Sequence, residues 1–233
     1  MADVIVQIYG IRTVEDARMV IELGAHHIGV NYGKKMYTPG QLTCEKAKEI
    51  FEGVQPEAVK VGLTCAEDVD EITENLKVVV PDVLHLSGDI EGLSPADVQE
   101  IRNRFPGLKI MQALPVLAGV PLEEQKIMQY IKDYEPVTDV FLIDTKAPSD
   151  TVIGATGLTH DRQIDKVIVE STKVPCIIAG GLDPENVAEA IRITHPYGVD
   201  SYSWTNFDEP RPNGEGCKDP AKCKAFIEAA RNA

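Results

Sequence analysis

Short runs rich in β-branched and other apolar residues alternate with longer amphipathic segments along the whole chain. The short runs predict eight β-strands, over residues 4–9, 27–32, 58–64, 82–87, 108–114, 139–144, 174–180 and 198–203. The segments between them have apolar residues spaced three or four positions apart, which is typical of helices with one buried face. The pattern therefore predicts a chain of strand–helix units that build a parallel sheet.

Several of the predicted helices begin at recognisable N-cap residues, whose side chains accept hydrogen bonds from N–H groups of the first turn. Ser94, Asp183 and Asp219 each precede a proline, the residue best suited to the first helical position. Thr64 and Glu67 have the spacing of a capping box, which predicts a helix that begins directly after residue 64.

Eight strand–helix units in 233 residues, with no low-complexity linker, fit a closed (β/α)8 barrel, the TIM barrel. We expect one α/β domain that spans residues 1–233. The alternative is an open doubly wound sheet, which would need a Gly-x-Gly-x-x-Gly turn after the first strand. The sequence there is Tyr9-Gly10-Ile11-Arg12, so the barrel is favoured.

Charge and composition limit the classes of partner that the protein can bind. The formal net charge of -14 opposes binding to nucleic acid or to an anionic membrane surface. No apolar run approaches the roughly 20 residues of a membrane helix, and we expect a cytoplasmic protein, as a monomer or a homodimer. The 5 cysteines are scattered without Cys-x-x-Cys spacing, which predicts reduced thiols and no structural zinc site.

The alternation of side chains along each predicted strand shows which polar residues can face the interior of the barrel. In a parallel barrel, alternate residues of each strand point into the interior, and those at the carboxyl ends can reach a ligand. The more apolar face of each strand is expected to pack on the helices, which leaves the polar alternates inside. This filter predicts interior or rim positions for Gln7, Tyr9, His27, Asn31, His85, Ser87 and Gln112. Gln7 and Asn31 are candidates for substrate contacts.

Asp144 ends the sixth predicted strand, directly after an apolar run at residues 140–143. Burial at the edge of an apolar core raises the pKa of a carboxyl group toward the range that general acid–base catalysis needs. We interpret Asp144 as a catalytic residue, with capping of the following turn as the alternative. Lys146 is a candidate to stabilise a phosphate or an oxyanion, and a solvated lysine is the alternative.

The connection from residue 145 to residue 161 is long for a strand-to-helix loop, which usually has about 2 to 6 residues. Gly154 and Gly157 bracket small residues in it, as in a closing lid or a backbone site for an anion. His160, beside Asp161, is a candidate general base. In the alternative, Asp161 caps the next helix.

The clearest chemical pattern follows the seventh strand, where Gly180 and Gly181 precede Asp183-Pro184. Glycines let an anion approach bare backbone N–H groups, and barrels of this kind often hold a phosphate at this end. A tight turn is the alternative. Ser203 ends the eighth predicted strand and is a candidate to contact the same anion. The pattern predicts a small phosphorylated substrate.

With these residues the chain resembles the phosphoribosylanthranilate isomerase family of ribulose-phosphate-binding barrels. The resemblance covers nearly the whole chain and is most specific at residues 142–146, 179–187 and 198–201. It implies an Amadori rearrangement, in which a phosphorylated aldosylamine becomes a 1-amino-1-deoxyketose without a metal or an organic cofactor. It also implies that Asp144 is the general acid toward the ring oxygen and that a cysteine takes the proton from C2.

The chain departs from this family around the reactive end. The family's Lys-Ile-Cys-Gly reads Gln7-Ile8-Tyr9-Gly10, so a phenol with an ordinary pKa near 10 replaces the basic thiol. The loop after the second strand lacks the family's arginine, for which Lys34 or Lys35 is an imperfect stand-in. In the phosphate loop after Asp200, Trp204 stands in the place of a glycine. These departures allow a substrate other than phosphoribosylanthranilate.

His160, His85, Tyr9 and Asp200, in this order, are the candidates for the missing base. The leading hypothesis remains isomerisation of a small phosphorylated sugar derivative. A second is a metal-assisted epimerase or lyase, in which His85, Asp144 and His160 gather around a divalent ion. A third is a phosphosugar-binding protein without activity. Loss of activity with a chelator would favour the second, and binding without turnover would favour the third.

Overall fold

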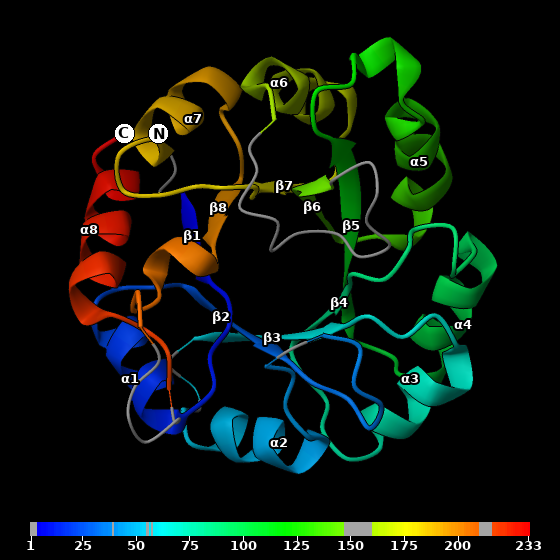
Figure 1. Ribbon diagram of the computed structural model, residues 1–233. Coiled ribbons are helices and arrows are strands. Elements are labelled where there is room, and N and C mark those ends of the chain that lie inside the picture. Colours follow the sequence, from blue (N-terminus) through cyan, green and yellow to red (C-terminus); the bar gives the residue numbers. More distant parts are fainter. Residues whose placement is uncertain (1–3, 39, 55, 57, 147–159, 210–215) are drawn as a thin grey trace.

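The computed structural model describes residues 4–38, 40–54, 56, 58–146, 160–209 and 216–233 of the chain. The parallel strands close into a barrel in which each strand pairs with its sequence neighbours and β8 pairs with β1 (Figure 1). The strands are β1 (Ile5–Ile8), β2 (His27–Asn31), β3 (Val59–Thr64), β4 (Val83–Leu86), β5 (Lys109–Leu117), β6 (Val140–Lys146), β7 (Cys176–Ile178) and β8 (Gly198–Ser201). The predicted (β/α)8 barrel is confirmed.

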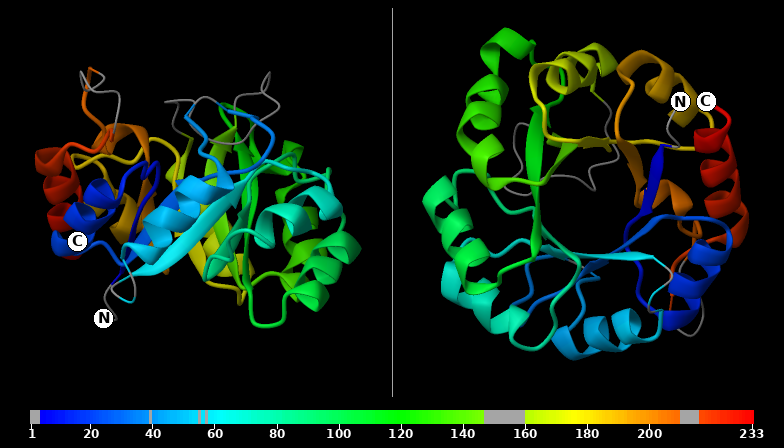
Figure 2. Two further views of the ribbon diagram at one scale, coloured as in Figure 1. Left: turned by 90° about the horizontal axis from the view of Figure 1, so that it is seen from below. Right: turned by 180° about the vertical axis from the view of Figure 1, so that it is seen from behind.

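Helices form a ring around the barrel, and Figure 2 shows this ring from behind and from the side. They are α1 (Val14–Glu22), α2 (Cys44–Glu52), α3 (Val69–Leu76), α4 (Pro95–Arg104), α5 (Ile127–Tyr134), α6 (Arg162–Ser171), α7 (Val187–Thr194) and α8 (Pro220–Arg231). Among the described residues, short 3-10 turns accompany them, namely η1 (Leu122–Glu124), η2 (Glu135–Val137) and η3 (Ser203–Thr205). Within the described residues, no helix has both the length and the apolar character needed to cross a membrane.

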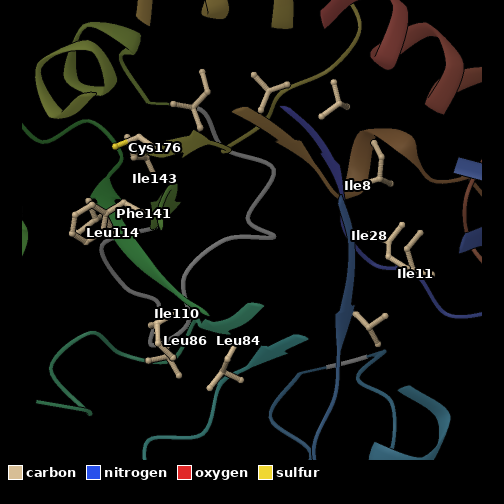
Figure 3. Packing of buried hydrophobic residues seen from close by; sticks show 14 of the residues in the cluster. Ile8, Ile11, Ile28, Leu84, Leu86, Ile110, Leu114, Phe141, Ile143 and Cys176 are labelled. Atoms are coloured by element: carbon tan, nitrogen blue, oxygen red, sulfur yellow. The ribbon is translucent and has the colours of Figure 1, made fainter. Parts of the chain in front are cut away.

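Two apolar layers hold this architecture together. The outer layer lies between strands and helices, and Figure 3 shows part of it, including Ile8, Ile28 and Phe141. The inner layer fills the barrel with side chains of the opposite strand face, namely Tyr9, Val61, Val83, Met111, Val140, Leu142, Ile177 and Ala179. Because burial of apolar surface contributes roughly 25 cal/mol per Å², these two layers are the main source of stability.

Strand alternation places most of the predicted interior residues correctly, and Gln112 is the exception. Met111 belongs to the inner layer, whereas Ile110 and Leu114 belong to the outer one. Gln112 therefore shares the outer face, where its amide nitrogen lies 3.5 Å from the carbonyl oxygen of Leu86. The prediction was wrong because β5 is apolar on both faces, so that its sequence does not reveal which parity points inward.

Helix starts agree with the sequence at α4 and α8. Ser94 and Asp97 form a reciprocal capping box at the start of α4. Asp219 caps α8 by accepting hydrogen bonds from the N–H groups of Ala221 and Lys222. Because each cap satisfies N–H groups that lack a partner within the helix, these two boundaries are well determined by local sequence.

The starts of α3 and α7 differ from the prediction. Thr64 is the last residue of β3, and Asp68 caps α3, so Thr64 and Glu67 form no capping box. Glu67 accepts a hydrogen bond from the N–H of Asp89 instead, at 2.8 Å. Asp183 closes a turn by accepting from the N–H groups of Glu185 and Asn186, and α7 begins only at Val187.

Candidate active site

Two carboxyl groups meet at the carboxyl ends of the strands. Asp144 lies near the end of β6 and Asp200 lies in β8, where it pairs in register with Gln7 of β1. The register of β6, β7 and β8 places Asp144 and Asp200 at one level, on either side of Ala179. Ala179 belongs to the inner layer, so strand alternation directs both carboxyl groups into the barrel.

Burial changes the acidity of both groups. It raises the pKa of Asp144 to about 6, while a hydrogen bond from the Thr145 N–H opposes this shift. It raises the pKa of Asp200 to about 8, and the negative charge of Asp144 adds to the increase. Because the groups interact, the values belong to the pair, which holds one proton between about pH 6 and pH 8.

Tyr9 and His85 pair with each other across the barrel. The hydroxyl of Tyr9 lies 2.7 Å from Nδ1 of His85, and both side chains are buried. The Tyr9 ring lies on the backbone of Gly29, where any Cβ atom would overlap it. Burial lowers the pKa of His85 to about 3, and burial and the charge of Asp200 raise the pKa of Tyr9 well above 10. Both are therefore neutral at pH 7 and are poor bases.

His160 lies behind the barrel mouth, between β6 and α6. Its Nδ1 is 2.7 Å from Oγ1 of Thr145, and its Nε2 is 2.5 Å from Oδ1 of Asp165. Both ring nitrogens are thus used within the protein, and the side chain is only 1% exposed. These contacts hold the imidazole of His160 within the protein, and its role as the first candidate for the base stays a prediction. Asp161 caps α6, as the alternative interpretation expected.

Arg162 extends the contacts of His160 to β7. Its guanidinium donates to Oδ2 of Asp165 at 2.9 Å and to the carbonyl oxygens of Ala179 and Gly180. The first turn of α6 is thereby tied to the glycine turn after β7. The sequence analysis missed both charged residues, although their three-residue spacing at a helix start was visible.

The glycine turn has the geometry predicted for an anion site. Gly180 and Gly181 have φ angles of 75° and 69°, which favour glycine over every other residue. A Cβ atom on Gly180 would overlap Oγ1 of Thr145. Within the described part of the chain, the N–H groups of both glycines meet no acceptor, while Asn186 donates to the Gly181 carbonyl. These two N–H groups are available to an anion.

Ser203 lies after β8 rather than in it, at the exposed start of η3. Buried Lys218, also missed by the sequence analysis, holds this loop from beneath. Its Nζ donates to the Tyr202 carbonyl oxygen, Oγ1 of Thr205 and Oδ1 of Asn206, at 2.7 to 3.0 Å. Since β7 and β8 are neighbours, their two loops lie on the same part of the rim.

The loop after β2 turns its lysines away from the barrel mouth. Lys34 pairs with Glu74 at 3.4 Å, and Lys35 pairs with Glu71 at 2.5 Å, both on α3. Neither lysine therefore occupies the place of an arginine that faces the substrate. Asn31 donates to Oγ1 of Thr38 at 2.6 Å, and its own Oδ1 has no partner among the described atoms.

Lys146 and the glycines of the long loop complete the set of predicted site residues. Lys146 reaches over the mouth to Asp89, with Nζ 3.3 Å from Oδ2, so its charge is partly neutralised. Gly157 and Gly154 lie outside the described residues. Within the described ranges, no three histidine, cysteine or acidic side chains are arranged to hold a metal ion. The metal-assisted hypothesis, which needed His85, Asp144 and His160 together, therefore lacks its ligand set there.

The fold and the site define a (β/α)8-barrel enzyme with a titrating carboxyl pair beside a glycine turn suited to a phosphate. The family model described as N-(5'phosphoribosyl)anthranilate (PRA) isomerase matches residues 6–229. The chain belongs to this family and is an isomerase of phosphorylated sugar derivatives. A relative named N-(5'-phosphoribosyl)anthranilate isomerase 2, from Methanosarcina mazei, is 32% identical over 97% of this chain and 94% of its own length.

Solved structures agree on the fold. The N-(5'-phosphoribosyl)anthranilate isomerase of Pyrococcus furiosus superposes with a TM-score of 0.77 at 23% identity, over 99% of this chain and 100% of that one. A phosphoribosyl anthranilate isomerase in complex with reduced 1-(o-carboxyphenylamino)-1-deoxyribulose 5-phosphate gives a TM-score of 0.74 at 24% identity, with the same coverage. The departures noted in the sequence therefore lie within a shared scaffold.

Proposed function

We propose that this chain isomerises N-(5'-phosphoribosyl)anthranilate to 1-(o-carboxyphenylamino)-1-deoxyribulose 5-phosphate. The observation that carries the proposal is the carboxyl pair of Asp144 and Asp200, which holds one proton near neutral pH. Such a pair contains one acid and one base at the same time, as this isomerisation requires. Family membership supplies the named substrate.

Formation of the enolamine needs one proton given and one taken. An acid protonates the furanose ring oxygen, the C1–O bond breaks, and the ring opens to an iminium ion. A base then removes the C2 proton, and the C–H electrons form the C1–C2 double bond while the iminium nitrogen takes up its electron pair. The enolamine loses its hydroxyl proton and gains a proton at C1, so the net proton balance is zero.

The pair provides both roles without a cysteine. Asp144 occupies the position of the family's acid, and Asp200 is the partner that takes the proton from C2. The reactive form therefore carries the shared proton on Asp144 and leaves Asp200 ionised, although the higher pKa of Asp200 makes the opposite arrangement the more populated one at neutral pH. Tyr9 and His85 are neutral and bound to each other, so neither competes for this role. Asp200 thus replaces His160 as the preferred base among the four candidates. Transfer of a proton by a positioned carboxyl group contributes about 10²- to 10⁴-fold to a rate.

The phosphate of the substrate would lie on the glycine turn. The N–H groups of Gly180 and Gly181, which meet no acceptor in the part of the chain that the structure describes, support this position, and the hydroxyl of Ser203 lies on the neighbouring loop. Hydrogen bonds from backbone N–H groups need no positive side chain, which suits a protein with a net charge of -14.

The carboxylate of the anthranilate group would meet Arg12, in the loop between β1 and α1. Arg12 follows β1, which is paired with β8, and its positive charge opposes the effect of burial, which raises the pKa of Tyr202 in the loop after β8. Lys34, Lys35 and Lys146 are paired with acidic residues. Within the described loops at the carboxyl ends of the strands, Arg12 is the basic side chain without a partner. A guanidinium group binds a carboxylate through two parallel hydrogen bonds.

The direct test is to supply N-(5'-phosphoribosyl)anthranilate to the purified protein and to follow its loss. We expect turnover, and we expect Asp144→Asn to lower kcat by about 10²- to 10⁴-fold. Asp133→Asn, a change to an exposed carboxylate on α5, is the matched control and should leave kcat unchanged. The control ligand is reduced 1-(o-carboxyphenylamino)-1-deoxyribulose 5-phosphate, an analogue of the product. If this compound stabilises the protein against heat but the substrate is not turned over, the isomerase proposal is rejected and a binding protein is favoured.

A further inference from the structure

A chain of three buried side chains connects the floor of the barrel to Asp200. Nε2 of Gln7 donates to Oδ1 of Asp200 at 3.1 Å. Oε1 of Gln7 lies 3.1 Å from Nδ1 of His27 on β2. Gln7 is fully buried, and His27 and Asp200 are each 6% exposed, so bulk water does not replace these contacts. The register of β1 with both neighbouring strands pairs Gln7 with His27 and with Asp200.

The donors and acceptors of these three side chains determine the direction of each hydrogen bond between them. A glutamine amide has an oxygen that only accepts and a nitrogen that only donates. Because Oε1 faces His27, Nδ1 of His27 must carry a hydrogen atom and donate it. Burial and the charges of His26 and Lys109 lower the pKa of His27 to about 4, so the ring is neutral at pH 7 and this is its single N–H.

The direction of the hydrogen bond from Gln7 to Asp200 influences which oxygen of Asp200 holds its proton. Oδ1 accepts a hydrogen bond from Gln7, and the carbonyl oxygen of a protonated carboxyl group is a better acceptor than its hydroxyl oxygen, so this contact favours the proton on Oδ2. Oδ2 is the oxygen left for a substrate. We infer that Gln7 and His27 are positioning residues, which orient the carboxyl group of Asp200 and place its transferable proton on Oδ2.

This inference rests on the proposed function, because it assigns a task in that reaction to two residues whose printed contacts are within the protein. The titratable and charged groups around Asp200 are Asp144 from β6, Tyr9 from β1 and Lys218, which precedes α8. Burial and Asp144 favour the protonated form, whereas Gln7 and Lys218 favour the ionised form. Gln7 alone among them donates a hydrogen bond to the carboxyl group, so its removal should change both orientation and acidity.

The test compares the pH dependence of kcat in variants of the two positions. Gln7→Met keeps the length of the side chain but removes its donor, and we expect about a tenfold loss of kcat. Since the lost hydrogen bond favoured the ionised form, the alkaline limb should move upward by roughly one pH unit. KM should stay within about twofold, because positioning residues act on the chemical step. Gln7→Lys should move the same limb downward.

The position of His27 provides a rescue experiment. His27→Leu removes the donor that holds Oε1 of Gln7, and we expect a smaller loss of kcat in the same direction. His27→Gln restores an N–H donor and should recover most of that loss. Gln112→Met is the matched control, because Gln112 is a buried amide on the outer face of β5. It should lower stability but leave the alkaline limb unmoved.

A readout without turnover separates this inference from the proposed function. The infrared band of the protonated Asp200 carboxyl group can be identified by its loss in Asp200→Asn. The intensity of this band should titrate with a midpoint near pH 8, and the midpoint should move to higher pH in Gln7→Met. Nitrogen NMR should find the hydrogen of neutral His27 on Nδ1. A wild-type protein that shows both signatures but no turnover would reject the proposed reaction and support the positioning of Asp200 by Gln7 and His27. A hydrogen on Nε2 of His27, or an unchanged titration midpoint in Gln7→Met, would overturn that positioning.

Discussion

The two halves of the barrel mouth use buried polar residues in opposite ways. Around β6 to β8, Asp144 and Asp200 have pKa values of about 6 and about 8, and the N–H groups of Gly180 and Gly181 meet no acceptor within the described residues. Around β1 to β4, Tyr9 and His85 are bound to each other, and burial keeps both neutral. Residue type alone therefore does not identify the reactive group, because partners and burial decide which group titrates near neutral pH.

The largest expected difference concerns kcat. Asp200→Asn should lower kcat by about 10²- to 10⁴-fold, because the pair loses one of its two exchangeable sites. Tyr9→Phe removes only the hydroxyl that faces His85 and should cost less than about tenfold. Steady-state kinetics of both variants with the same substrate preparation checks this. A Tyr9→Phe variant as inactive as Asp200→Asn would show that the tyrosine takes part in the proton transfer after all.

A second difference concerns stability. His160→Ala should lower the free energy of unfolding by about 3 kcal/mol or more, because it leaves Asp165, which is fully buried, without one of its partners. The exposed His195 ends α7 with a φ angle of 47°, which asparagine also tolerates. His195→Asn should change stability by less than about 0.5 kcal/mol. Urea unfolding of the two variants measures the difference, and equal midpoints would refute a structural role for His160.

The sequence predicted the scaffold well because strand alternation and helix periodicity are local patterns. It placed Gln7, Tyr9, Asn31 and His85 inside, since the alternate positions of their strands are clearly apolar. It failed at Gln112, where both faces of β5 are apolar, and at the start of α3, where Asp68 competes as a cap with Thr64. Local rules do not decide between such equal candidates.

Partners distant in sequence were beyond the reach of the same rules. Tyr9 and His85 are separated by 76 positions, and Gln7 and Asp200 by 193, so only the closed barrel brings them together. The sequence therefore identified Asp144 and Asp200 as candidates but ranked His160 above Asp200. It also offered Lys34 or Lys35 as an imperfect stand-in for the family's arginine, because their pairing with α3 depends on tertiary structure.

The carboxyl pair should also make stability depend on pH. The folded-state pKa of Asp200, about 8, is raised above its unfolded value, so the folded protein binds more protons between about pH 4 and pH 8. The stability that comes with the bound proton is fully present below pH 4 and is lost as the pH rises through 8. Asp200→Asn, which never ionises, should therefore be more stable than wild type at pH 9, by up to about 5 kcal/mol. Thermal unfolding at pH 5 and pH 9 checks this, and a pH-independent difference would contradict it.

The smallest expected effect distinguishes two kinds of basic residue at the mouth. Arg12→Gln should raise KM for N-(5'-phosphoribosyl)anthranilate by about tenfold with little change in kcat, because it removes a contact made equally in the bound substrate and in the transition state. Lys34→Gln is the matched control and should leave KM unchanged, since Lys34 pairs with Glu74 and is half exposed. A substrate analogue without the carboxyl group sharpens the comparison. Wild type should bind it about as weakly as Arg12→Gln binds the true substrate, and Arg12→Gln should no longer distinguish the two. Equal loss of affinity for both compounds in Arg12→Gln would place the arginine at the sugar or the phosphate instead.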